Sequence, residues 1–117
     1  FKGIEGLRAG TPLYDIGYRV QQYAESFGYG VIRAYTGHGI GREMHEDPSV
    51  PNYGRQGTGV RLKAGTVLRV EPMIAMGDYH LRILPDGWGA VTKDGKPAAH
   101  YENTLVIRED GVEILTL

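Results

Sequence analysis

The sequence predicts an α+β fold, because a helical pattern comes first and strand patterns follow it. Apolar residues recur at steps of three and four over residues 13–27, and from residue 66 onward short β-type segments alternate with turn residues. No linker or shift in composition divides the 117 residues, a length typical of one domain. We therefore predict that residues 1–117 form a single domain in which antiparallel strands pack against helices.

The main helix is predicted from its apolar stripe and its end signals. Thr11 is a suitable N-cap, Pro12 fits the first helical position, and Gly28 follows as a stop signal. The apolar stripe consists of Leu13, Ile16, Val20, Ala24 and Phe27. A shorter helical segment is predicted over residues 1–9, where apolar residues also recur at helical spacing before Gly10.

The strands are predicted from β-rich segments that are bounded by turn residues. They cover residues 31–35, 66–74, 79–84, 88–92, 98–107 and 112–115. Residues 93–96 (Lys-Asp-Gly-Lys) predict a hairpin turn, and residues 109–111 predict another turn. Residues 36–59 contain six glycines and two prolines, so this segment is predicted to be mostly loop.

The composition argues against several classes of function. The chain has 13 basic and 14 acidic residues, a balance that argues against a nucleic-acid partner held by bulk charge. Its apolar runs are far shorter than the ~20 residues of a membrane span, so no membrane partner is expected. The absence of cysteine excludes disulfides and a cysteine nucleophile, and it is compatible with a cytoplasmic location.

Three segments carry candidate metal ligands. His38 has a glycine on each side and precedes His45 by seven residues, Glu71 lies in an apolar segment before a proline, and Glu102 shares a strand face with His100. Imidazole and carboxylate ligands together suit Mn, Fe, Co or Zn. The alternatives are solvated loop histidines, an edge-strand carboxylate and a polar strand face that meets water. The residues alone therefore indicate a candidate divalent-metal site and nothing more specific.

Four sequence blocks, taken in order, resemble type I methionine aminopeptidases. The blocks are residues 37–41 (with 44–48 and 51–53), 70–74, 86–88 and 101–104, which read Gly-His-Gly-Ile-Gly (with Met-His-Glu-Asp-Pro and Pro-Asn-Tyr), Val-Glu-Pro-Met-Ile, Asp-Gly-Trp and Tyr-Glu-Asn-Thr. Prolidases and aminopeptidases P share the first block, but they usually have Glu-Pro-Gly where this chain has Glu-Pro-Met at 71–73. The resemblance covers essentially the whole chain, and four ordered blocks are far more specific than any one of them.

The resemblance implies a fold, an activity and a metal centre. The implied fold is the C-terminal half of the pita-bread fold, with an antiparallel sheet covered by helices. The implied activity is metal-dependent removal of N-terminal methionine from peptides and nascent proteins. His38, Glu71 and Glu102 match ligands of a dinuclear centre that holds two divalent ions of Co, Mn, Fe or Zn, and Glu102 would bridge both ions.

The resemblance also assigns substrate and catalytic roles. Glu71 would shuttle a proton from the attacking water, and His45 would hydrogen-bond the substrate and stabilise the tetrahedral intermediate. Met44 and Trp88 would line the pocket for the methionine side chain of the peptide. This assignment is chemically coherent, because a carboxylate beside two cations can act as a general base.

The departures from the family bear on activity. Met44 stands where phenylalanine is usual, His100 where glutamine is common, and Asn103 where histidine is common. Two aspartate ligands of the family lie in its N-terminal half, to which nothing in this sequence corresponds. We therefore expect the isolated chain to be inactive or weak. Three arrangements remain open: a homodimer, a complex with a separate N-terminal half, or a peptide-binding module without catalysis.

Overall fold

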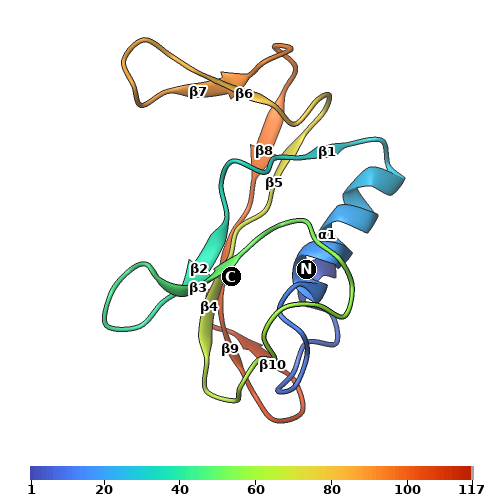
Figure 1. Ribbon diagram of the computed structural model, residues 1–117, viewed down its shortest axis with the longest axis vertical. Coiled ribbons are helices and arrows are strands. Elements are labelled where there is room, and N and C mark those ends of the chain that lie inside the picture. The colour runs from blue at the N-terminus through green and yellow to red at the C-terminus, as the bar shows by residue number, and fades with distance from the viewer. Residues whose placement is uncertain (117) are drawn as a thin grey trace.

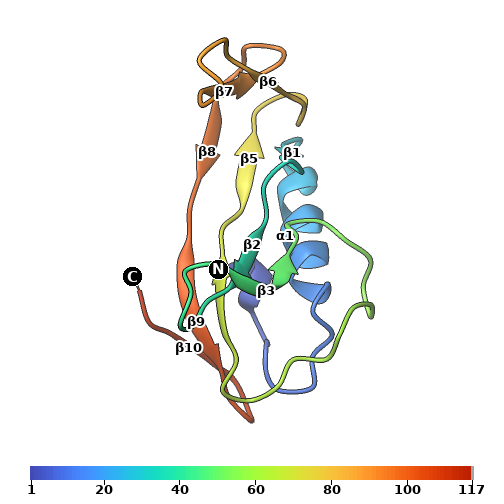
Figure 2. The same cartoon turned by 60° about the vertical axis from the view of Figure 1, so that its left-hand side comes forward.

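Two long antiparallel segments run side by side and form the framework of the molecule (Figure 1). The computed structural model describes residues 1–116. One segment consists of β4 (Val67–Val70) followed by β5 (Met73–Ala75), and the other of β8 (Ala98–His100) followed by β9 (Asn103–Ile107). β4 pairs with β9 and β5 pairs with β8, so each segment passes from one sheet into another. Figure 2 shows both segments extending along the length of the molecule.

A five-stranded antiparallel sheet occupies one end of this framework. Its strand order is β10-β9-β4-β2-β3, and its outer strands are β10 (Val112–Ile114) and β3 (Glu46–Val50). β2 (Gly37–Gly39) lies between β4 and β3. Gly37 permits this placement, because a Cβ at that position would collide with the backbone carbonyl oxygen of Arg69 on β4. The position of β2 between two neighbouring strands therefore requires glycine at residue 37, next to His38.

Two smaller sheets lie toward the other end. β1 (Gly30–Val31), β5 and β8 form a three-stranded antiparallel sheet with β5 in the middle. β6 (Leu81–Ile83) and β7 (Ala90–Thr92) form a separate two-stranded hairpin, which projects from the top of the view in Figure 1.

One face of the framework is covered by α1 (Asp15–Ser26), with the short 3₁₀ helix η1 (Lys2–Ile4) beside its first turns. The main core packs residues of both helical segments against the five-stranded sheet, and it consists of Ile4, Leu7, Leu13, Ile16, Val50, Leu62, Leu68, Val70, Leu105 and Ile107. Leu68 and Leu105 are cross-strand partners and both are fully buried. Burial of one such leucine side chain contributes about 1.5–3 kcal/mol. A smaller cluster joins Val20 and Ala24 of α1 to the three-stranded sheet.

The predicted α+β class and the antiparallel strands are confirmed, but the predicted start of the helix is wrong. α1 begins at Asp15 after Tyr14, and no side-chain hydrogen bond caps it. The Thr11 hydroxyl instead accepts a hydrogen bond from the Arg8 N–H at 3.2 Å, and Pro12 forms an isolated β-bridge with Arg61. The bridge to Arg61 comes from a segment distant in sequence, so local capping signals could not indicate it.

Several other predicted features differ in the structure. The segment predicted to be mostly loop, residues 36–59, is mostly irregular but contains strands β2 and β3. The single strand predicted over residues 98–107 is two strands in different sheets, and the strand predicted over residues 31–35 contains regular structure only at Gly30–Val31. The turn at residues 93–96 joins β7 to β8, which do not pair, so it is not a hairpin. Phe27 is 60% exposed and does not extend the buried stripe of α1.

Candidate metal centre

Both framework segments are interrupted at the same level. β4 and β9 stay paired as far as Val70 and Asn103, and β5 and β8 begin their pairing at Met73 and His100. Two residues lie between these pairs on each segment, namely residues 71–72 and residues 101–102. Proline at position 72 lacks an N–H group and fits an interruption of this kind. Since both gaps have equal length, the segments keep their register across the break.

The interruption places Glu71 opposite Glu102. The Tyr101 N–H donates to the Pro72 carbonyl at 3.2 Å and holds the two segments together. The side-chain amide of Asn52, which is fully buried, donates to the Glu71 carbonyl at 3.3 Å. Two strand breaks and one buried amide therefore hold two acidic residues, far apart in the sequence, at one position of the framework.

A cluster of three ligand-type side chains forms at this interruption. One ligand atom each from Glu71, His100 and Glu102 lies within 4.8 Å of the other two. His100 Nε2 is 3.8 Å from Oε2 of Glu102. The other oxygen of Glu102, Oε1, is 4.0 Å from a guanidinium nitrogen of Arg69 on β4. Nε of Arg69 donates a hydrogen bond to the Thr104 hydroxyl on β9 at 3.3 Å. We call Glu71, His100 and Glu102 the strand-break cluster.

His38 reaches the strand-break cluster from β2. Its Nε2 lies 3.4 Å from Oε2 of Glu71, and its Nδ1 lies 2.9 Å from the Gly39 carbonyl oxygen. A carbonyl oxygen only accepts hydrogen bonds, so this contact assigns the proton to Nδ1 and leaves a lone pair on Nε2 in the neutral imidazole. Histidines that bind metals commonly donate their other N–H to a backbone carbonyl in this way. His38 is thus oriented as a metal ligand would be.

The predicted substrate residues occupy more exposed positions. The His45 ring lies beside the His38 ring, with centroids 4.1 Å apart, and its side chain is exposed. Met44 is 64% exposed in the same loop. Trp88 is 91% exposed in the loop between β6 and β7. The structure therefore brings His45 next to His38, whereas Met44 and Trp88 do not form the wall of an enclosed pocket within the described residues.

An apolar groove of about 300 Å³ adjoins the strand-break cluster. Its lining includes His100 and its cross-strand partner on β5, Met73. Ile32 and Tyr35, from the segment after β1, also line it. A small apolar groove beside a polar cluster is a common arrangement for a ligand site. This groove lies next to the cluster and has a lining suited to an apolar side chain.

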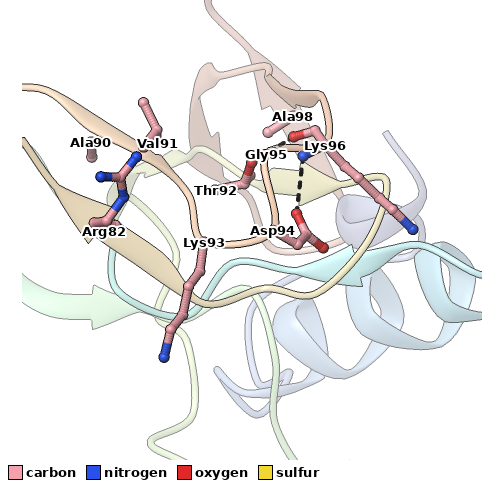
Figure 3. A pocket seen from close by; sticks show the side chains of 9 residues that line it. All are labelled: Arg82, Ala90, Val91, Thr92, Lys93, Asp94, Gly95, Lys96 and Ala98. Atoms are coloured by element: carbon pink, nitrogen blue, oxygen red, sulfur yellow. Dashed lines mark hydrogen bonds between the residues drawn. The ribbon is translucent and has the colours of Figure 1, made fainter.

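A larger cavity, of about 620 Å³, lies on the β6–β7 side of the molecule. Arg82, Lys93 and Lys96 line it, but the two lysine side chains point in different directions (Figure 3). Asp94 accepts the Lys96 N–H at 3.0 Å and the Asp78 N–H at 2.8 Å. These backbone hydrogen bonds lower the pKa of Asp94 and mark it as a turn-forming residue. The cavity therefore contains no group of convergent cations.

The residues present fit a divalent cation. The strand-break cluster and His38 supply two carboxylates and two imidazoles, a mixture of oxygen and nitrogen ligands that suits Mn, Fe, Co or Zn. The lone pair of His38 Nε2 faces a carboxylate oxygen of Glu71 at 3.4 Å, and a cation would be attracted by both atoms. The donor chemistry is thus that expected for the metal centre implied by the sequence.

Sequence reasoning missed two contributors to this site. The sequence indicates His100 only as a neighbour of Glu102 on a polar strand face and as a departure from the family, and Asn52 only as a member of the block at 51–53, without a role. Strand alternation was a usable signal for His100, because residues 100 and 102 point to the same side of a strand. Asn52 had no local signal, since its contact with Glu71 depends on the packing of a loop against β4 and β5.

The architecture is that of half a pita-bread fold, as solved structures demonstrate. Methionine aminopeptidase from Rickettsia prowazekii matches 99% of this chain with a TM-score of 0.96 and 51% sequence identity, over 47% of its own length. Prolidase from Pyrococcus furiosus, at 24% identity and a TM-score of 0.71, shares the fold over 99% of this chain. Both alignments use a part of a longer protein.

Sequence comparison identifies the family. The model of metallopeptidase family M24 matches residues 1–109, and the chain belongs to this family. The methionine aminopeptidase of Clostridium acetobutylicum is 56% identical over 117 residues, which are 100% of this chain and 47% of that protein. Methionine aminopeptidase B of Synechocystis is 48% identical over 116 residues. The chain spans about half the length of the curated relatives it matches. The similarity to methionine aminopeptidases over the whole chain is thereby confirmed.

Within residues 1–116, no helix is long and apolar enough to cross a lipid bilayer.

Proposed function

We propose that this chain supplies one half of the active site of a methionine aminopeptidase, an enzyme that hydrolyses the peptide bond after an N-terminal methionine. The observation that supports the proposal is that Glu71 lies close both to His38, at 3.4 Å, and to Glu102. The similarity to methionine aminopeptidases along the entire chain supports the choice of substrate. We further propose that the enzyme acts in the cytoplasm.

In this proposal, His38, Glu71 and Glu102 are metal ligands. Two divalent ions of Co, Mn, Fe or Zn would polarise the scissile carbonyl and lower the pKa of a water molecule when bound. Glu71 has two carboxylate oxygens, of which Oε2 faces His38. A carboxylate in this position accepts a proton from the attacking water and passes it to the leaving amine.

The neighbouring residues orient the peptide. His45 lies against His38 and donates a hydrogen bond to the carbonyl oxygen of the substrate, which stabilises the charge of the tetrahedral intermediate. Met44 and Trp88 pack against the methionine side chain, and their large exposed surfaces become buried when the peptide and the rest of the enzyme are present. The groove beside His100 offers a further apolar surface for this side chain.

The chain alone is expected to be inactive or weak. The resemblance places two aspartate ligands in a part of the relatives to which this chain does not align, and the chain covers only 47% of the Clostridium acetobutylicum protein. Two carboxylates and one imidazole form a small ligand set for two cations. Efficient hydrolysis therefore requires the complementary part of the fold.

Complementation tests this function. The segment of the Clostridium acetobutylicum relative that this chain does not cover is produced separately and mixed with the chain, and cleavage of a Met-Ala peptide is measured with Mn²⁺. We expect little activity from either part, activity from the mixture, and its loss with Glu71→Gln. Glu109→Gln, in an exposed turn, is the matched control and should retain activity. Association of the two parts without any gain in rate would contradict the proposal.

A self-associated chain is the second candidate, favoured by an exposed apolar groove of about 310 Å³ on the three-stranded sheet. Tyr29, Ile74 and Met76 line this groove and would be covered by a partner. Sedimentation of the chain alone distinguishes the two candidates. A dimer that persists in dilute buffer supports self-association, whereas a well-folded monomer that binds the complementary segment supports the shared active site.

A further inference from the structure

His100 ends strand β8 directly beside the two acidic residues of the strand break. Its Nε2 atom is 3.8 Å from Oε2 of Glu102, and a ligand atom of His100 lies within 4.8 Å of one from Glu71. Its side chain is 43% exposed, so it is accessible and its substitution does not disturb the core. We infer that His100 is a further nitrogen ligand of the cation that Glu71 and Glu102 hold, an inference that rests on the proposed function.

The charge distribution favours a cation at this point. Like charges directly opposite each other on paired strands destabilise a sheet, and Glu71 and Glu102 are opposed in this way across the strand break. Arg69 offsets part of this repulsion, but it lies 4.0 Å from Oε1 of Glu102. His100 lies near the other carboxylate oxygen, Oε2. The side of Glu102 that faces Glu71 and His100 therefore holds negative charge and a nitrogen donor together.

The two histidines reach the acidic pair from different strands. His38 contacts Oε2 of Glu71 from β2, and His100 contacts Oε2 of Glu102 from β8. His38 is buried, and none of its atoms belongs to the strand-break cluster, in which the ligand atoms lie within 4.8 Å of one another. His100 is a member of that cluster. In the chain by itself, His100 is thus the imidazole best placed to share a cation with both carboxylates.

Calorimetric titration with Zn²⁺ tests the inference on the 117-residue chain. His100→Gln removes the nitrogen donor and keeps a polar side chain of similar length, and we expect Zn²⁺ binding to weaken at least about tenfold. His80→Gln is the matched control, because His80 is also exposed and close to a carboxylate, with Nδ1 2.6 Å from Asp78, but lies outside the strand-break cluster. We expect this control to bind Zn²⁺ as the parent chain does.

Imidazole ¹⁵N NMR gives a readout that does not depend on activity. Addition of Zn²⁺ should move the Nε2 resonance of His100 to the position of a metal-bound nitrogen and leave the His80 resonances unchanged. The backbone amide spectrum of His100→Gln should remain that of the folded chain.

The outcomes separate this inference from the proposed function. If Zn²⁺ binds and Glu71→Gln abolishes binding, but His100→Gln has no effect and the His100 resonances do not move, the inference is wrong and the proposed ligand set of His38, Glu71 and Glu102 stands. If the parent chain binds no Zn²⁺, the inference is also overturned. Complementation then decides independently whether the proposed function survives.

Discussion

Glu71 and Glu102 lie opposite each other at matching interruptions of two neighbouring antiparallel segments. Val70 and Asn103 form the last pair of β4 and β9 before the break. Glu71 directly follows Val70, and Glu102 directly precedes Asn103. The chain therefore brings the two carboxylates together by strand register, a feature of the backbone. Substitutions that disturb this backbone should reduce metal binding even where they touch no ligand.

Gly37→Ala should disturb β2 and with it His38. A Cβ at position 37 would meet the backbone carbonyl oxygen of Arg69, which cannot move without separating β2 from β4. Overpacking of this kind costs about 1–3 kcal/mol. Urea unfolding should show that loss, and Zn²⁺ affinity should fall because His38 is displaced from Glu71.

Gly111→Ala is the control for this variant. A Cβ at Gly111 meets nothing within 4 Å, and this glycine does not have a positive φ angle. Equal stability of the two alanine variants would contradict the close approach of β2 to β4.

Asn52→Ala should lower both stability and metal affinity. Asn52 is fully buried, and its amide donates to the Glu71 carbonyl at 3.3 Å. Loss of the donor leaves that carbonyl without this partner, at a cost of about 1–3 kcal/mol. Urea unfolding and Zn²⁺ calorimetry measure the two effects. Gln22→Ala, on the exposed side of α1, should change stability by less than about 0.5 kcal/mol. If both variants bind Zn²⁺ like the parent chain, Asn52 does not position Glu71.

The loop between β6 and β7 should respond to acid through Asp86. Oδ1 of Asp86 accepts the N–H groups of Gly89 at 2.8 Å and Trp88 at 2.9 Å. These hydrogen bonds hold the pKa of Asp86 below its ordinary value of 3.8. A carboxyl group with a lowered pKa stabilises the fold above its unfolded-state pKa, and this contribution is lost as the pH falls through the folded-state pKa.

NMR titration of the Trp88 and Gly89 amide protons follows this loss. We expect both signals to shift with a midpoint below pH 3.8, because protonation weakens the hydrogen bonds that lower the pKa of Asp86. In Asp86→Asn, the same signals should not titrate in this range. A midpoint at or above 3.8 in the parent chain would show that the loop does not hold the carboxylate as described.

Several parts of the fold could be predicted from local patterns. The apolar stripe from Leu13 to Ala24 is buried as its helical spacing indicated, and the turn at 109–111 joins β9 to β10. Pro72 lies at the interruption between β4 and β5, which fits a residue without an N–H to donate. In each case, the deciding physical property belongs to residues close together in sequence.

Other parts depend on contacts between distant segments. Nothing local marks a break at Tyr101, because residues 98–107 contain no glycine or proline. The break is explained by the matching gap beside Pro72 on the neighbouring segment. The segment that contains Gly37 and Gly39 is predicted as loop, but both glycines lie in strand β2, where they permit close approach of neighbouring strands. His38 lies 3.4 Å from Glu71, but the group of mutually close ligand atoms contains His100, whose place in the cluster required the three-dimensional structure.

The central claim is that His38, Glu71 and Glu102 converge on one cation site. Titration of the ¹⁵N-labelled chain with substoichiometric Mn²⁺ tests it most directly, because the paramagnetic ion broadens the amide signals nearest to it. The account predicts that residues 38, 71 and 102 lose signal first and that Glu71→Gln removes this selectivity. Broadening centred on another acidic segment, or equal broadening along the chain, would contradict it.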